Sequence, residues 1–388
     1  MSITEALLGM DTVTCETPEE VSDMMATGES QLEARGRRVS LANPKRTFRI
    51  GCWNVRTMFA GGRTAMVVNE MRRCKLSILG VGEVRWLGFG RVRTSKGEVI
   101  LYSGAEEIHH RGAGIILNRE AQECVMEWAP INERIIRARI YSRFAKTTVL
   151  QTYAPTNEAC EEEKENFYKQ LQREIEKTPK HDILLLMGDV NAKMGTANER
   201  WKGTIGTEGT GVMNENGERF LEFCAINDLV IGGTLFKHKD IHKFTWESPN
   251  HRDRNQIDHI AINGRYRRSL LDTRAMRGAD VGSDHHLVIA KLRLKLTRYG
   301  VAGPGRRLTY DIVRLKSPTV RKAFVLELRN RFQCLQADDE GVAGDMNRDT
   351  EKDSEDLVEI VWNKFKVAYS STATKLVGFK KRKFKKSG

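Results

Sequence analysis

Short runs of apolar, β-branched residues recur through the middle of this chain, and several of them stop abruptly at a polar residue. The clearest run covers residues 183–187, reads Ile-Leu-Leu-Leu-Met and is followed at once by Gly188-Asp189. An uninterrupted apolar run of this length, closed by a turn residue, is typical of a buried strand. This pattern favours a fold in which sheets lie inside and other layers cover them.

Further strands and helices are predicted between residues 47 and 297. The other predicted strands are 47–53, 77–81, 99–102, 114–117, 147–153, 257–262 and 287–292, and residues 134–141 alternate as a half-exposed strand would. Residues 161–177 are predicted to be helical because Phe167, Leu171 and Ile175 recur every four positions, and 64–73 offer a shorter helix. The mixture predicts an α/β domain with its sheets inside and its helices outside.

The two ends of the chain differ from this domain. Residues 1–46 are acidic, then basic, lack sustained periodicity and are predicted to form a flexible arm. From residue 298 a helical extension is predicted, with Ser317-Pro318 as the cap and first turn of a helix. An acidic linker over 338–356, a second helical stripe and a basic tail follow. The apolar stripes of the two helices are Val320, Phe324, Leu328, Phe332 and Leu357, Ile360, Val361, Phe365.

The formal net charge of +13 on 388 residues points to an acidic polymer or an anionic surface as a partner. Residues 1–34 hold eight acids and no Lys or Arg, while the last fourteen residues hold seven bases and no acid. These ends nearly cancel, so the body between them is itself basic. The cluster at 380–386 reads either as a nuclear import signal or as a solvated tail with nonspecific affinity for nucleic acid.

Cysteine usage and hydropathy indicate where such a chain works. Seven cysteines are scattered without CxxC pairs, which argues for a reducing compartment and against a disulfide scaffold or a zinc site. The N-terminus has no basic region followed by an apolar stretch, and no apolar run approaches the roughly 20 residues of a membrane span. We therefore expect a soluble protein that is neither secreted nor membrane-bound, nuclear or alternatively cytoplasmic.

Polar side chains that suit phosphate chemistry sit at the ends of the predicted strands. They are Asn54, Glu83, Tyr153, Asp189, Asn191, Asp258, Asp284 and His285. Taken singly, each is more often a turn residue, a cap or a surface side chain. Taken together, they supply oxygen ligands for a hard cation such as Mg²⁺ and groups that polarise a water and surround a phosphate. The set therefore predicts phosphodiester cleavage.

Two other kinds of site are excluded by spacing. Asp189-Val-Asn191 is not the start of a calcium loop, because the glycine falls one place late, at Gly195, and Arg200 stands where the final Glu should be. Ser283 is not a triad nucleophile, because no Gly-x-Ser-x-Gly turn surrounds it.

The same motifs carry a family resemblance. The series Trp-Asn-Val, Gly-Glu, Tyr-Ala-Pro-Thr, Gly-Asp-x-Asn, Ile-Asp and Ser-Asp-His, in this order over residues 47–297, resembles the endonuclease/exonuclease/phosphatase superfamily. The resemblance implies a four-layer sandwich of two packed mixed β-sheets flanked by helices. It also implies a Mg²⁺-dependent DNA endonuclease that leaves 3′-hydroxyl nicks, with Mn²⁺ and RNA as the alternative metal and substrate.

Finer motifs are similar to one branch of that superfamily. Gly82-Glu-Val-Arg-Trp86, Asn214-Glu-Asn-Gly-Glu-Arg219 and Phe244-Thr-Trp-Glu-Ser-Pro249 resemble endonucleases of non-LTR retrotransposons. Within that branch they look most like the host-encoded group called craniofacial development protein 2-like. The segment from about residue 299 resembles the region that joins endonuclease to reverse transcriptase in such elements, without the polymerase.

The resemblance also implies a role for each residue. Glu83, Asn54 and Asp284 would hold the metal, Asp189 would orient or deprotonate the attacking water, and Asn191 would bind that water or the phosphate. His285, oriented by Asp258, and Tyr153 would contact the phosphate or the leaving group. Trp246 either stacks near the nucleic acid or packs beneath the site.

One departure from the family pattern concerns Arg56. Abasic-site enzymes of this fold often place an Asp two residues after the first Asn, and Arg56 stands there. An Arg reduces the local negative charge and offers a phosphate contact, which moves the expectation from abasic repair toward nicking of intact DNA. Two alternatives stay open: a catalytically silent relic that binds nucleic acid or a partner, and a phosphatase acting on another phosphoester.

Overall fold

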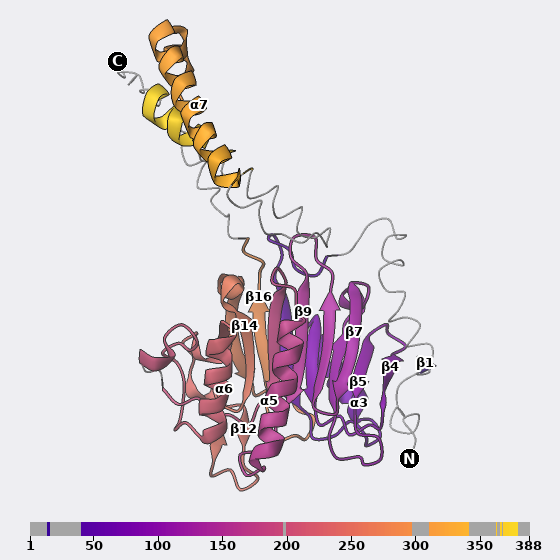
Figure 1. Ribbon diagram of the computed structural model, residues 1–388. Helices are drawn as coiled ribbons and strands as arrows, with labels where there is room; N and C mark the ends of the chain where they lie inside the picture. Colours follow the sequence, from indigo (N-terminus) through magenta and orange to yellow (C-terminus); the bar gives the residue numbers. More distant parts are fainter. Residues whose placement is uncertain are drawn as a thin grey trace, which may run out of the picture. The chain divides into compact units, whose positions relative to one another are not determined.

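The computed structural model describes residues 14–15, 40–196, 199–296, 310–340, 362, 365–366 and 368–378. The chain divides into two compact units between Leu296 and Thr297, and each is described by itself. The larger unit is built from two β-sheets with helices on their outer faces (Figure 1). No helix among the described residues is long and apolar enough to cross a membrane.

The first sheet has the strand order β1-β4-β5-β6-β3-β2-β16-β15. It is mixed, because β2 and β3 run parallel and the other neighbours run antiparallel. Its strands are β1 (Thr14–Cys15), β2 (Phe48–Asn54), β3 (Ile78–Gly82), β4 (Phe89–Arg93), β5 (Val99–Ser103), β6 (Ala113–Leu117), β15 (Leu270–Met276) and β16 (Leu287–Leu292).

The second sheet has the order β11-β14-β10-β9-β8-β7, with β9 and β10 parallel. Its strands are β7 (Val125–Asn132), β8 (Ile135–Ile140), β9 (Thr147–Tyr153), β10 (Ile183–Asp189), β11 (Leu229–Ile231) and β14 (Asp258–Asn263). A short hairpin of β12 (Trp246–Glu247) and β13 (Arg254–Asn255) stands apart from both sheets. Every strand predicted from the sequence is present, with ends that differ by two residues at most.

Strand β10 shows why its sequence lacks polar residues. Ile183, Leu185 and Met187 join the core shared with residues of the first sheet, whereas Leu184 and Leu186 face the core under the helices. Both faces of the strand are thus buried, and each buried Leu or Ile side chain contributes roughly 1.5–3 kcal/mol.

Helices complete the outer layers. Helix α3 (Arg63–Arg73) packs Val67, Val68 and Met71 onto the first sheet, and α5 (Glu161–Glu176) and α6 (Glu215–Ile226) cover the second. A single short turn, α4 (Arg119–Gln122), follows β6. The predicted four-layer sandwich of two mixed sheets flanked by helices is therefore confirmed, with α5 and α6 lying side by side over one face (Figure 1).

The smaller unit is a short helical extension. A 3₁₀ segment (Ile312–Lys316) leads into α7 (Pro318–Glu340), which begins at the predicted Ser317-Pro318 position. Phe324 packs against Ala373 and Val377 of a π-helical turn (Ala373–Val377). The predicted start of the acidic linker is wrong, because α7 continues over residues 338–340.

Several predictions about the two ends of the chain concern residues that lie outside the described ones. The predicted arm at 1–46 lies largely outside the described residues, although Thr14–Cys15 pairs with β4. Residues 357, 360 and 361 of the second stripe and the basic cluster at 380–386 also lie outside them. The division into an arm, a domain and an extension stays a prediction.

Candidate active site

The predicted polar residues meet at one edge of the two sheets, which we call the site edge. Because β2 and β3 are parallel and in register, Asn54 lies opposite Gly82, and Glu83 follows directly. In the second sheet Asp189 lies opposite both Tyr153 of β9 and Asp258 of β14. The loop before β16 brings Asp284 and His285 to the same edge. Strand register therefore gathers side chains that are far apart in sequence.

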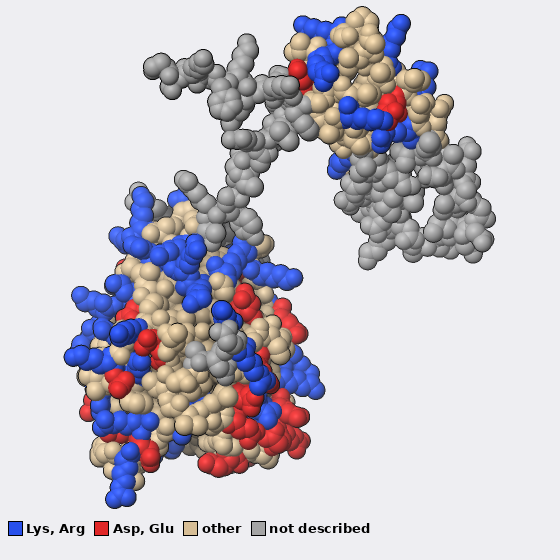
Figure 2. All heavy atoms as spheres, turned by 90° about the vertical axis from the view of Figure 1, so that its left-hand side faces the viewer, with Lys and Arg blue, Asp and Glu red and all other residues tan. Residues whose placement is uncertain are grey.

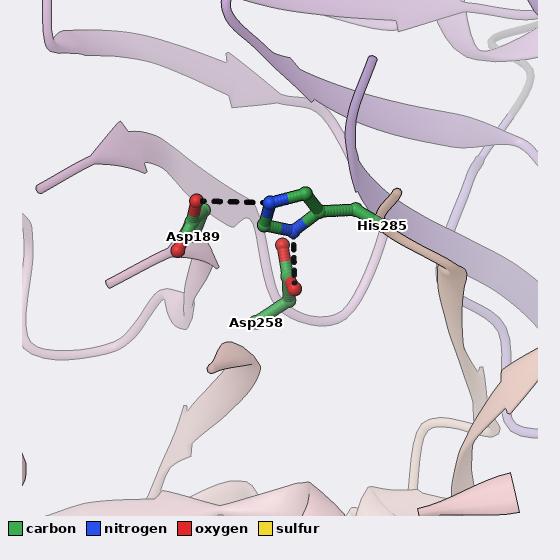
Figure 3. Close-up of side chains that lie close together, drawn as sticks. All are labelled: Asp189, Asp258 and His285. Carbon is green, nitrogen blue, oxygen red and sulfur yellow. Dashed lines mark hydrogen bonds and ion pairs between the residues drawn. The ribbon is translucent and has the colours of Figure 1, made fainter. Parts of the chain in front are cut away.

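His285 lies between two buried carboxylates (Figure 3). Its Nδ1 is 2.9 Å from Oδ2 of Asp258, and its Nε2 is 3.8 Å from Oδ2 of Asp189. Burial alone would lower the pKa of His285, but the negative charges of Asp258 and Asp189 outweigh it and raise the pKa to about 9. The two carboxylates thus favour the protonated imidazole, whose Nδ1–H would be donated to Asp258 while Nε2 faces Asp189.

The pKa of Asp189 is raised toward neutral pH. Burial and the neighbouring Asp258 raise its pKa to about 7, while His285, the Asn54 amide and the Asn191 backbone N–H oppose that rise. The two hydrogen bonds it accepts are 3.0 Å each, from Nδ2 of Asn54 and from the backbone N–H of Asn191. A carboxylate with a pKa near neutrality suits acceptance of a proton from water.

Asn54 joins Asp189 to Glu83. Its Nδ2 donates to Oε1 of Glu83 at 2.9 Å as well as to Asp189, while its Oδ1 accepts the backbone N–H of Arg56 at 2.9 Å. One amide thus holds the two carboxylates at a fixed separation. In this arrangement both polar atoms of the Asn54 side chain already have partners.

Two of the predicted metal ligands form ion pairs with arginines. Nη2 of Arg85 donates to Oε2 of Glu83 at 2.7 Å, and Nε of Arg56 lies 3.8 Å from Oδ1 of Asp284. Asp284 also accepts Nε1–H of Trp246 at 3.1 Å. Among the described residues Asp284 makes no hydrogen bond or ion pair with Glu83, so the predicted metal set is only partly brought together.

The carboxylates nevertheless fit a hard cation. Oδ1 of Asp258 and Oδ1 of Asp284 are buried and accept no hydrogen bond from any described residue, although Arg56 lies 3.8 Å from the latter, and carboxylate oxygens are the ligands that Mg²⁺ prefers. Asp189, Asp258 and His285 also bring potential ligand atoms within 4.8 Å of one another. The predicted division of labour, with Glu83, Asn54 and Asp284 on the metal and Asp189, His285 and Asp258 in proton chemistry, stays a prediction.

Tyr153 and Asn191 flank the carboxylates. Burial, and then the charges of Glu83 and Asp189, raise the pKa of Tyr153 well above its usual range, so the phenol keeps its proton and acts as a donor. Nδ2 of Asn191 donates to the Ala154 carbonyl at 3.0 Å. The predicted contact of Asn191 with a water or a phosphate stays a prediction.

Backbone strain gathers at the same edge. Arg56, Glu83, Arg85 and Asn191 all have φ between 50° and 59°, a left-handed conformation that side chains other than glycine adopt at a cost of roughly 1–3 kcal/mol each. Strain of this kind persists where the surrounding structure fixes it, and it is frequent at functional sites.

Three hydrogen bonds were not anticipated from the sequence. Oγ of Ser283 donates to the Asn54 carbonyl at 2.7 Å and accepts the backbone N–H of His285, and Nε1 of Trp53 donates to the His285 carbonyl at 2.9 Å. They tie the loop of Asp284 and His285 to strand β2. Trp246 is half-buried beside Asp284, and its contact with nucleic acid stays a prediction.

The sequence of this chain is similar to those of two known proteins. No family model matches the chain. Over 269 residues, 69% of the chain, the sequence is 40% identical to craniofacial development protein 2 of Bos taurus and 39% identical to the protein of that name from Tragulus javanicus. The chain spans 45% and 46% of those proteins, less than half of their length. The resemblance to that group, predicted from the motifs, is confirmed.

Solved structures give weaker likenesses. The endonuclease domain of TRAS1, a telomere-specific non-LTR retrotransposon, is 18% identical and aligns over 64% of this chain and 99% of its own with a TM-score of 0.48. AP endonuclease LMAP from Leishmania major is 12% identical and aligns over 73% of this chain and 97% of its own, also with a TM-score of 0.48. We assign the fold from the two packed mixed sheets themselves.

Proposed function

We propose that this chain, a protein of the endonuclease/exonuclease/phosphatase fold, is a Mg²⁺-dependent DNA endonuclease that hydrolyses one phosphodiester bond and leaves a 3′-hydroxyl nick. The observation that carries the proposal is the buried series Asp189, His285 and Asp258, joined through Asn54 to Glu83. It combines a proton acceptor, a fixed cation and carboxylates for a metal within one edge of the sheets.

Each residue then has a chemical task. Asp189 accepts a proton from water as the water oxygen bonds to phosphorus. The bond from phosphorus to O3′ breaks, the 3′ oxygen leaves with the electron pair and takes a proton from solvent, and the phosphate stays on the 5′ side. Cationic His285 and the Tyr153 hydroxyl donate hydrogen bonds where negative charge accumulates. Asp258 keeps His285 charged and oriented.

Glu83, Asn54 and Asp284 would hold the metal. A divalent cation bound there supplies positive charge beside the phosphate oxygens and lowers the barrier to attack. To bind it, Glu83 and Asp284 would exchange Arg85 and Arg56 for the ion, and the freed guanidinium groups would be placed to contact phosphate.

A second candidate function also has a specific observation in its favour. The pairing of Arg85 with Glu83 partly neutralises the main proposed ligand, which suits a nucleic-acid-binding protein that does not cut. No comparable observation favours a phosphatase acting on another phosphoester. The basic body supports DNA as the substrate, and we extend the proposal to a retroelement origin and a nuclear site of action.

One experiment separates cutting from binding. Purified protein is incubated with supercoiled plasmid and Mg²⁺, beside Glu83→Ala, Asp189→Ala and a matched control, Glu165→Ala, which removes an exposed carboxylate on α5. We expect nicking by the parent and the control that both site variants lose, and nicks that DNA ligase reseals, as 3′-hydroxyl and 5′-phosphate ends require. Retention of DNA in a gel shift without any nicking by the parent would favour the silent candidate.

A further inference from the structure

The end of the larger unit opposite the site edge is strongly basic. There the loops 40–47, 141–146, 177–182 and 293–296 meet the 3₁₀ segment Gly264–Ser269. These five segments hold eleven basic side chains and a single acid, Asp182. The basic residues are Lys45, Arg46, Arg143, Lys146, Lys177, Lys180, Arg265, Arg267, Arg268, Arg293 and Lys295, and we call this surface the basic end.

Hydrogen bonds join these loops into one continuous surface. The backbone N–H of Arg293 donates to the Ser269 carbonyl, and the Tyr266 hydroxyl donates to the His181 carbonyl. Ile183 N–H donates to the Lys146 carbonyl, which ties the loop before β10 to the loop before β9. The Arg143 N–H donates to Oγ of Ser40, which adds the segment that precedes β2. The basic side chains therefore lie on one connected face.

The charges on this face are available to a ligand. All eleven basic side chains except half-buried Lys146 are exposed, although Lys177 is paired with Glu174 at 2.6 Å, and the one acid, Asp182, is buried in a pair with Arg139. Arg267, Arg268, Arg293 and Lys295 form no ion pair with any residue that the structure describes. In Figure 2, Lys and Arg side chains gather at the upper end of the larger unit, whereas acidic and basic side chains mix at its lower end.

The basic end is separate from the proposed catalytic chemistry. Strand β2 runs from the basic end at Phe48 to the site edge at Asn54, a rise of about 20 Å for a seven-residue strand. A single duplex on the site edge would have to fold back around the domain to reach the basic end. Bending 20–30 base pairs by only 40–90° already costs on the order of 1–6 kcal/mol. A second segment reaches the basic end without this bending cost.

We propose that the basic end binds the sugar-phosphate backbone of a second duplex segment, so that the protein holds two segments at opposite ends. Exposed Arg and Lys side chains on several loops outnumber the neighbouring exposed acids, such as Asp228 beside Gly264, and match the sequence-independent pattern of phosphate contacts. This binding needs no metal and no cleavage, so it goes beyond the proposed nuclease activity.

A bridging assay in EDTA tests the proposal on the full chain. A biotinylated duplex is saturated with protein on beads, washed, and offered a fluorescent second duplex. The variants are Arg267→Glu/Arg268→Glu and, independently, Arg293→Glu/Lys295→Glu. The control is Lys169→Glu, which reverses a charge at an exposed position in the middle of α5, two turns before Lys177. Melting temperatures confirm that each variant is folded.

We expect both basic-end variants to capture about tenfold less of the second duplex. The slope of log affinity against log salt concentration should also become shallower, by the amount that about two phosphate contacts contribute. The control should bridge like the parent. Equal bridging by all proteins would overturn the proposal. Binding of each protein to vesicles of phosphatidylcholine and phosphatidylserine is measured as well. If the two basic-end variants bridge normally but lose binding to these vesicles, the proposal is overturned and the ligand is an anionic membrane.

Discussion

Nδ1 of His285 lies 2.9 Å from Oδ2 of Asp258, and both side chains are buried between the two sheets. This pair is the fixed element of the proposed site, because Asp258 contributes the largest of the effects that raise the pKa of His285 against its burial. The proposed role of His285 as a charged donor thus depends on Asp258.

Replacing Asp258 tests that dependence in the metal-free protein. Asp258→Asn removes the largest of the charges that raise the pKa of His285, so the pKa measured by NMR titration should fall below about 9, although Asp189 still raises it. Cleavage should fall by about 10²-fold or more, as loss of a positioned proton donor does. The exposed Asp253→Asn should change neither quantity, and an unshifted His285 in Asp258→Asn would refute the pairing.

The Arg85–Glu83 pair predicts a gain of metal affinity on mutation. Arg85→Ala removes a cation that occupies Oε2 of Glu83 at 2.7 Å, so Mg²⁺ should bind about tenfold more tightly, which corresponds to about 1.4 kcal/mol. Calorimetric titration without DNA measures this, with Arg91→Ala as a control on β4. Unchanged affinity would show that Glu83 does not hold the ion.

Glu98 predicts how stability depends on pH far from the site. Burial would raise its pKa, but hydrogen bonds from Arg72 and Thr94 overcome this and lower the pKa to about 2. Its stabilising effect should be complete above about 4.5 and be lost as the pH falls toward 2. Glu98→Gln should therefore cost about 1.5–3 kcal/mol at pH 7 in urea unfolding and progressively less below pH 4. A cost that stays constant with pH would contradict the charge-based account.

Gly217 predicts a change opposite in sign to helix propensity. Gly to Ala inside a helix normally stabilises by roughly 1 kcal/mol, but a Cβ at Gly217 of α6 would lie 2.0 Å from the Lys193 carbonyl oxygen. Gly217→Ala should destabilise by about 2 kcal/mol, seen as a lower urea midpoint. Gly278→Ala, where nothing lies within 4 Å, is the control. A stabilised Gly217→Ala variant would mean that the close approach does not exist.

Much of the fold could be predicted because buried strands leave plain marks in a sequence. The run at 183–187 is apolar throughout since both faces of β10 are covered, and the polar residue that ends it is a site residue. The strands that were not predicted include β4, β7 and β15. In β4 half-buried arginines alternate with Gly90 and Val92 and the exposed residue is Phe89, and β7 contains Pro130 and two register shifts, so neither shows a clean pattern. Helix α6 was missed because Gly217 in its first turn reads as a turn signal, although there it permits a close packing contact.

The site was predictable in its residue types but not in its present contacts. Motif order placed Asn54, Glu83 and Asp189 at strand ends, and strand register brings them together. The spacing of two positions did not predict the ion pair between Arg85 and Glu83. This pair depends on the left-handed backbone at both residues, which turns their side chains toward each other. The only sequence feature that pointed to this pair was the motif Gly82-Glu-Val-Arg-Trp86, which contains both residues.

The central claim is that Asp189 is the group that activates water, and its replacement is the most direct test. Single-turnover cleavage and DNA affinity are measured side by side for the parent and Asp189→Asn, a near-isosteric change that keeps an acceptor for the Asn54 amide. We predict that cleavage falls by about 10²-fold or more while DNA affinity changes less than about twofold. Cleavage that persists, or cleavage and binding that fall together, would contradict the account.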